Sequence, residues 1–100
     1  MEEDIELYVC SFYGKRLHIY TSSSTTEVDL DFQPTALTFI NDTSYAIGGQ
    51  HPPSLQIRRK DNNECMRSLN VASPVRSLAV SSDGLHLCVG MTGGLLLSVD

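Results

Sequence analysis

Short apolar or alternating runs, separated every few positions by turn residues, extend along the whole chain. No stretch keeps apolar residues at helical spacing across three turns with caps at its ends, so the pattern predicts an all-β protein. No linker or low-complexity segment divides it. Ten strands are expected, at residues 5–12, 16–21, 27–32, 35–40, 44–49, 54–59, 65–71, 75–81, 86–90 and 95–99.

The same order of features recurs about 40 residues apart, which is the period of a repeat protein. Leu37 corresponds to Leu78, 41 residues later, and Gly48 to Gly90, 42 residues later. A fainter third copy precedes these two. One equivalent residue in each of the three copies is followed eight residues later by an apolar residue. These pairs are Val9 and Leu17, Ile47 and Leu55, and Val89 and Leu97.

Residues 75–100 show the repeat most fully. A first strand ends in the turn Ser82-Asp83-Gly84, a second ends in Gly90, and a third follows Gly93-Gly94 and ends in Asp100. This order and spacing resembles a blade of the WD-repeat β-propellers. The resemblance implies antiparallel four-stranded blades in an incomplete propeller. The expected parts are an acidic leader at 1–4, a partial first blade at 5–32, a second blade at 33–72, and a third at 73–100 lacking its outer strand.

The chain departs from the family pattern at several positions. It contains no Trp, so Tyr20, Arg58 and either Val99 or Asp100 stand where the family has its Trp-Asp pair. Aligning Asp100 with that pair would shift the last strand by one residue, and both registers stay open. The family's Gly-His pair is also missing, so its Asp-His-Ser-Trp hydrogen-bonded tetrad is not expected.

Ten strands make about two and a half blades, whereas closed propellers have roughly four to eight. We therefore expect a fragment of a longer protein or a truncated product, with an oligomer that closes the ring as the third alternative. Seven residues are predicted to be buried on strands: Leu37, Phe39, Ile47, Leu78, Val80, Leu87 and Val89.

Charge and composition narrow the class of partner. A net charge of -5 argues against a nucleic-acid surface, and no apolar run is long enough for a membrane span. The N-terminus is acidic and no apolar signal core follows it, so we expect the cytoplasm or the nucleus. Cys10, Cys65 and Cys88 are expected as free thiols packed like small apolar residues.

Two small groups of residues contain side chains of the types found in metal and catalytic sites. His86 and Cys88 have the spacing of a metal pair on one strand, but no second pair accompanies them. Ser82, Asp83 and His86 are the residue types of a hydrolytic triad, but one hairpin holds them too close in sequence to converge. The prediction is a chain without enzymatic activity, metal or cofactor.

The resemblance implies a scaffold that binds other proteins. In the family, partners dock on loops that here fall at 12–16, 33–34, 50–53, 73–74 and 91–94. The best anchors on those loops, by residue type, are Phe12, Tyr13, Arg16, His51 and Met91. The alternative is a phosphoinositide or membrane-surface effector using Arg58, Arg59 and Lys60. These resemble a paired-arginine motif, Phe-Arg-Arg-Gly, of lipid-binding propellers, although its Phe and Gly are absent and the three charges also suit a solvated strand end.

Overall fold

All regular structure in the described part of the chain is β-strand. The computed structural model describes residues 6–10, 14–94 and 96–99, so the predicted leader at 1–4 lies outside it. Within those ranges no helix is present that could cross a membrane. The strands are β1 (Leu7–Cys10), β2 (Arg16–Tyr20), β3 (Thr25–Asp29), β4 (Gln33–Phe39), β5 (Ser44–Gln50), β6 (Ser54–Arg59), β7 (Cys65–Asn70), β8 (Val75–Val80), β9 (Leu87–Met91) and β10 (Leu96–Val99).

Each predicted strand has an observed counterpart, so the all-β prediction is confirmed. The third differs most, because β3 begins two residues before the predicted start at residue 27 and ends three residues before the predicted end at residue 32. The turn that precedes it is tight: the N–H of Thr21 donates to the carbonyl oxygen of Ser24 at 2.9 Å. Tyr20 consequently pairs with Thr25, and polar residues typical of a loop become part of the strand.

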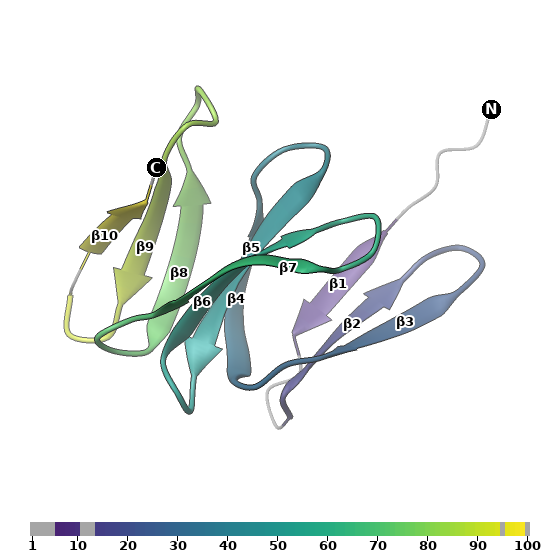
Figure 1. Cartoon of the computed structure of the whole chain (residues 1–100), viewed down its shortest axis with the longest axis horizontal. Coiled ribbons are helices and arrows are strands. Elements are labelled where there is room, and N and C mark those ends of the chain that lie inside the picture. Colours follow the sequence, from purple (N-terminus) through teal and green to yellow (C-terminus); the bar gives the residue numbers. More distant parts are fainter. Residues whose placement is uncertain (1–5, 11–13, 95, 100) are drawn as a thin grey trace.

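The strands form three antiparallel sheets, with a four-stranded sheet between two three-stranded ones (Figure 1). We call them the first sheet (β1-β2-β3), the middle sheet (β4-β5-β6-β7) and the last sheet (β8-β9-β10). Within each sheet, consecutive strands are neighbours, which is the simplest way to connect antiparallel strands.

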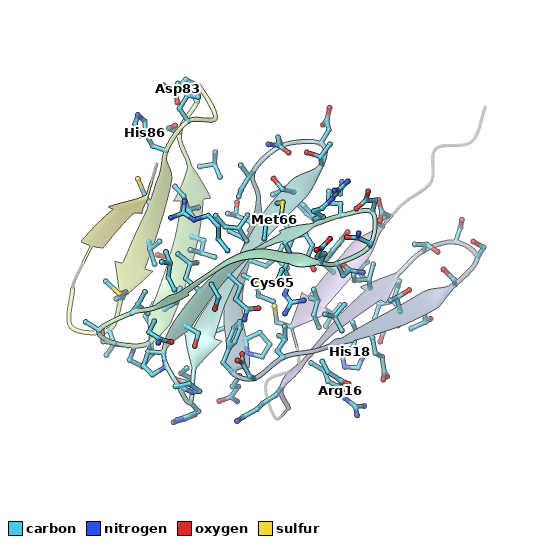
Figure 2. All side chains as sticks on the ribbon, in the orientation of Figure 1. Arg16, His18, Cys65, Met66, Asp83 and His86 are labelled. Atoms are coloured by element: carbon cyan, nitrogen blue, oxygen red, sulfur yellow. The ribbon has the colours of Figure 1, made fainter. Side chains whose placement is uncertain are left out.

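The cysteines are free, but two of them are not packed as predicted. Cys65 is exposed because it lies at the start of β7, an edge strand of the middle sheet (Figure 2). Cys88 is exposed because its side of the last sheet faces away from the middle sheet. Only Cys10 is half-buried, against the apolar cluster between the first and middle sheets.

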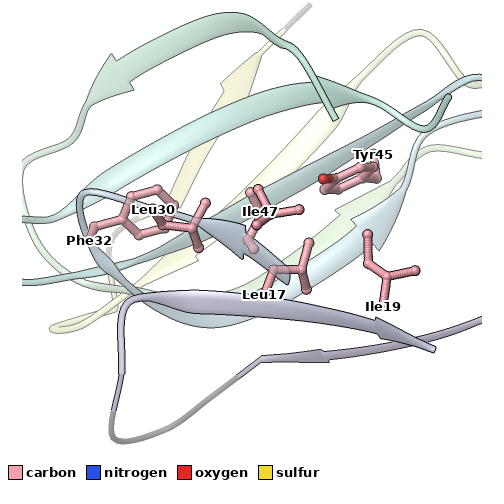
Figure 3. Close-up of a cluster of buried hydrophobic side chains, with 7 residues drawn as sticks. Leu17, Ile19, Leu30, Phe32, Tyr45 and Ile47 are labelled. Carbon is pink, nitrogen blue, oxygen red and sulfur yellow. The ribbon is translucent and has the colours of Figure 1, made fainter. Parts of the chain in front are cut away.

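Two apolar clusters hold the sheets together, one on each face of the middle sheet. The first joins Leu17 and Ile19 of β2 to Tyr45 and Ile47 of β5 (Figure 3). Tyr45, Ile47 and Leu17 are each fully buried. The second cluster joins the middle sheet to the last one through a further set of buried side chains: Ala46, Leu55, Val75, Leu87, Val89 and Met91.

The two faces of the middle sheet carry different side chains, and the flanking sheets repeat that difference. Toward the first sheet it presents Leu37, Tyr45 and Ile47, and toward the last sheet Ala46, Leu55 and Ile57. The first sheet contacts the middle one through Tyr8, Leu17 and Ile19. These residues lie 38 positions before Ala46, Leu55 and Ile57 and are their equivalents in the repeat. The last sheet contacts the middle one through Leu78, Leu87 and Val89. These residues lie 41 or 42 positions after Leu37, Tyr45 and Ile47 and are their equivalents in the repeat.

Strand pairing repeats in the same way. Leu37 pairs with Ile47 in the middle sheet, and Leu78 pairs with Val89 in the last sheet. The sequence repeat is therefore also a repeat of register, since each equivalent residue faces an equivalent partner.

A β-bulge occurs at the same place in both sheets. Thr35 is the extra residue of β4 and Arg76, 41 residues later, is the extra residue of β8. Gly48 and Gly90 lie opposite these bulges. The hydroxyl of Thr35 donates a hydrogen bond to the carbonyl oxygen of Val75, which ties the bulge of the middle sheet to the start of β8.

The predicted equivalence of Leu97 with Leu55 is wrong by one residue. Leu55 pairs with Gly48, whereas the partner of the equivalent Gly90 is Leu96. The hairpin of the last sheet is shorter by one residue: residues 91–95 separate its pair, and 49–54 separate the pair in the middle sheet. The shifted register, which the sequence had left open, is the observed one.

All seven residues predicted as buried are on strands. Ile47, Leu87 and Val89 are buried, and Leu37, Leu78 and Val80 are half-buried. Phe39 is the exception, with 45% of its surface exposed. It is the last residue of β4, beyond the covered part of the sheet. There its ring packs edge-on against the ring of Tyr8, with 4.9 Å between the two ring centres.

Candidate functional site

Five connecting segments meet at one end of the three sheets, along the lower edge of Figure 1. We call this the loop end, and it consists of residues 14–16, 30–34, 50–53, 71–74 and 91–94. Those of the predicted docking loops that the structure describes all lie in it. The segments at 21–24, 40–43, 60–64 and 81–86 form the opposite end.

A continuous series of hydrogen bonds connects the loops. The N–H of Leu30 donates to the carbonyl oxygen of Lys15 at 2.8 Å, and the amide of Gln50 donates to that of Gln33 at 2.9 Å. Further along, the N–H of Val71 donates to the carbonyl oxygen of Pro53 at 3.3 Å.

The last two loops are joined twice. The N–H of Thr92 donates to the carbonyl oxygen of Pro74 at 2.9 Å, and the hydroxyl of Ser73 donates to the carbonyl oxygen of Thr92 at 3.1 Å. Each loop is thus held by its neighbour, which gives the loop end a fixed shape.

The predicted anchors have unequal positions at this end. Phe12 and Tyr13 lie outside the described residues. Arg16 is exposed, but its guanidinium already pairs with Glu27 at 3.2 Å and Asp29 at 3.0 Å. His51 is exposed and has a φ of 58°.

Met91 differs from the other anchors because its side chain is only 9% exposed. It packs in the cluster between the middle and last sheets, so it supports that interface and offers little surface to a partner.

Two hollows lie side by side at the loop end. One of about 190 Å³ is lined by Gly14, Lys15, Gln33 and His51. The other, of about 450 Å³, is lined by Cys10, Pro34, Thr35, Gln50 and Arg76. The hydrogen bond between Gln33 and Gln50 joins their walls.

Sequence reasoning did not single out Lys15 or Arg76. Lys15 lies in a predicted docking loop, beside the aromatic and Arg residues that are the predicted anchors. Arg76 lies in a predicted strand, where it is the exposed extra residue of the bulge. The available signal was its alignment with Thr35, a polar residue at the equivalent place 41 residues earlier.

The three basic residues of the lipid alternative are engaged with the protein. Arg58 donates to the side chain of Gln56 at 2.9 Å and to the carbonyl oxygen of Asn63 at 2.8 Å. Arg59 pairs with Asp61 through two hydrogen bonds, the shorter 2.7 Å.

Lys60 completes the cluster, with its ammonium 5.1 Å from the centre of the Phe39 ring. A hollow of about 360 Å³ beside these residues is lined by three carboxylates as well as two cations: Glu6, Asp42, Asp61, Arg59 and Lys60. The surface is therefore mixed in charge and not a basic patch.

The hairpin at 81–86 holds a structural network, at the tip labelled by Asp83 and His86 in Figure 2. Ser81, not Ser82, contacts Asp83: its hydroxyl donates to the carboxylate at 2.5 Å and accepts from the N–H of His86 at 3.1 Å. The hydrogen bond from Ser81, followed by that from the N–H of Leu85, lowers the pKa of Asp83. These bonds shape a turn, because Asp83 and Ser81 both face backbone groups of their own hairpin.

No group of three or more His, Cys, Asp and Glu side chains that could hold a metal ion occurs within residues 6–10 and 14–94. On the first sheet, Glu27 lies 3.6 Å from His18 and also pairs with Arg16.

Comparison with known proteins adds no relative. Neither the known protein-family models nor the curated proteins contain a match to this chain.

Proposed function

We propose that the chain is part of a WD-repeat β-propeller that acts as a non-catalytic scaffold for a multiprotein complex in the cytoplasm or the nucleus. The repeat of pairing, bulges and sheet faces supports the propeller. The sheets stack through unlike faces, as repeats with one shared design do.

The number and pairing of the strands in each sheet agree with partial blades. By register, β1, β2 and β3 match β5, β6 and β7, while β8, β9 and β10 match β4, β5 and β6. In the described part of the chain, the first sheet lacks a counterpart of β4 and the last sheet lacks one of β7.

The observation that carries the scaffold function is the hydrogen-bonded loop end. Loops held on a rigid β framework make a preformed surface, which binds without a large cost in conformational entropy. The polar groups of the 81–86 hairpin are used to build a turn, so they give no support to a catalytic role.

The lipid-effector alternative finds less support. Arg58 and Arg59 would each have to exchange a contact within the protein for a lipid phosphate, and carboxylates surround the site.

The test is affinity capture of partner proteins from cell extract, quantified for three baits. His51→Gly removes the exposed ring at the loop end, and glycine accepts the positive φ of that position. Leu85→Ala, at the opposite end where Leu85 is 68% exposed, is the matched control. We expect at least one protein to be captured by the wild type and Leu85→Ala but not by His51→Gly, and to bind the wild type when purified. Identical captures by all three baits would contradict the proposal.

A further inference from the structure

Two cations, Lys15 in the loop end and Arg76 beside it at the start of β8, stand apart from every other basic residue of the chain. Of the seven Lys and Arg residues, five take part in contacts within the protein: Arg16, Arg58, Arg59, Lys60 and Arg67. The remaining two, Lys15 and Arg76, form no ion pair or side-chain hydrogen bond with any residue that the structure describes. Both are exposed.

Lys15 and Arg76 lie in adjoining hollows although 61 positions separate them in the sequence. Lys15 lines the hollow that also contains His51, and Arg76 lines its neighbour. Gln33 lines the first hollow and Gln50 the second, and a hydrogen bond joins these two side chains. The two charges are therefore displayed on one continuous surface with fixed polar groups between them.

The loop end differs in charge from the rest of the molecule. Its five segments contain two cations, Lys15 and Arg16, and one carboxylate, Asp31, which accepts a hydrogen bond from Gln56 at 3.4 Å. Asp29, which borders these segments, is paired with Arg16. The chain as a whole has a net charge of -5. An acidic protein with unneutralised cations at one end attracts and orients an acidic partner there, because like charges repel it elsewhere.

We infer that the loop end binds an acidic peptide segment of a partner protein, with carboxylates at Lys15 and Arg76. The inference rests on the proposed scaffold function and specifies the chemistry of its partner. A peptide suits the site better than a nucleic acid, since tight binding of nucleic acid needs many phosphate contacts and a basic surface. Gln33, Gln50 and His51 provide neutral polar groups along the path between the two cations.

The experiment measures binding of fluorescein-labelled hexaglutamate to the whole chain by fluorescence anisotropy, with hexaglutamine as the uncharged probe. The variants are Lys15→Gln with Arg76→Gln, and Lys60→Gln as a matched control at the opposite end. Lys15 and Arg76 are exposed, so their replacement leaves the core intact, and circular dichroism verifies the fold. We expect hexaglutamate to bind the double variant about fivefold more weakly than the wild type, the scale of two exposed charge contacts. The control should match the wild type, and about 0.3 M NaCl should reduce binding.

Three results would overturn the inference: equal affinity for hexaglutamate and hexaglutamine, no loss in the double variant, or an equal loss in the control. Tighter binding of an oligothymidylate, or of vesicles containing phosphatidylinositol phosphate, dependent on the same two residues would also overturn it in favour of a phosphate ligand. The scaffold function is judged separately. If hexaglutamate does not bind while capture still depends on His51, the scaffold function is retained and the acidic partner is rejected.

Discussion

Gly48 of β5 lies directly against Val75 of β8: a Cβ atom added to Gly48 would stand 2.8 Å from Cγ1 of Val75. Val75 is fully buried and fills the junction between the middle and last sheets. The absence of a side chain at Gly48 is thus a packing requirement, because the two sheets could not approach so closely across a methyl group.

Gly48→Ala should destabilise the protein by about 1–3 kcal/mol, the usual cost of overpacking a core. Gly90→Ala is the control at the equivalent position, where the closest atom to an added Cβ is the hydroxyl of Ser77, which can rotate away. Urea unfolding of both variants measures the difference. An equal loss in the two would mean that the Val75 contact does not limit the approach of the sheets.

Thr35→Val should cost about 1 kcal/mol, because it removes the hydrogen bond to the carbonyl oxygen of Val75 at nearly constant volume. Thr35→Ser keeps the hydroxyl and should lose less. The measurement is the free energy of unfolding in urea, and a loss in the serine variant as large as in the valine variant would rule out the hydrogen bond as the cause.

Alkaline pH should weaken the fold through Tyr45. Burial raises the pKa of Tyr45 from 10.0 to about 12, and its hydroxyl donates to Asn63 at 2.9 Å. Since the pKa in the folded state is the higher one, the stabilisation is complete below pH 10 and is lost as the pH rises from 10 to 12. The loss is on the order of 2 kcal/mol. Unfolding midpoints between pH 8 and pH 12 should fall less steeply in Tyr45→Phe than in the wild type; parallel curves would contradict this assignment.

The three thiols should react with Ellman's reagent in two phases. Cys65 and Cys88 are exposed, whereas Cys10 is half-buried and its burial raises its pKa. The folded protein should release two equivalents rapidly and the third slowly. Cys10→Ser should abolish the slow phase alone, and a lost rapid phase in that variant would reverse the assignment.

The isolated chain should be marginally stable and should self-associate. Leu7 and Val9, equivalents of the fully buried Tyr45 and Ile47, are 57% and 38% exposed on the open side of the first sheet. Uncovered apolar faces and edge strands favour association. Sedimentation across a concentration series, with Val9→Glu as the comparison, tests this. A cooperative, concentration-independent unfolding transition from a clean monomer would contradict it.

The strands could be predicted from the sequence because turn residues bracket each apolar run. The period of 41 or 42 residues also placed Leu37 and Leu78 in equivalent positions. It was insufficient where one residue of loop length decides the outcome. Because the hairpin before β10 is shorter by one residue, the equivalent of Leu55 is Leu96 and not Leu97. The alternation of residues within β10 does not distinguish the two registers.

The candidate site was predictable as a set of loops, but its charged residues were not. The loops follow from strand order, since alternate connections of an antiparallel sheet share an end. Whether a cation is free depends on contacts from distant segments. Arg16 is held by Glu27 and Asp29 on the neighbouring strand, whereas Arg76 is exposed at a bulge. A sequence pattern carries neither fact directly.

Because the two faces of each sheet are unlike, the stack of three has a direction. The sheet face that carries Tyr45 and Ile47 always meets the kind of face that carries Leu55 and Ile57, never its own kind. A further sheet of this design would fit at either end in one orientation only, and each addition would repeat the same rotation and shift. Such head-to-tail addition has two outcomes, a closed ring or an open spiral. The rotation between successive sheets therefore decides whether an assembly built on this repeat is finite.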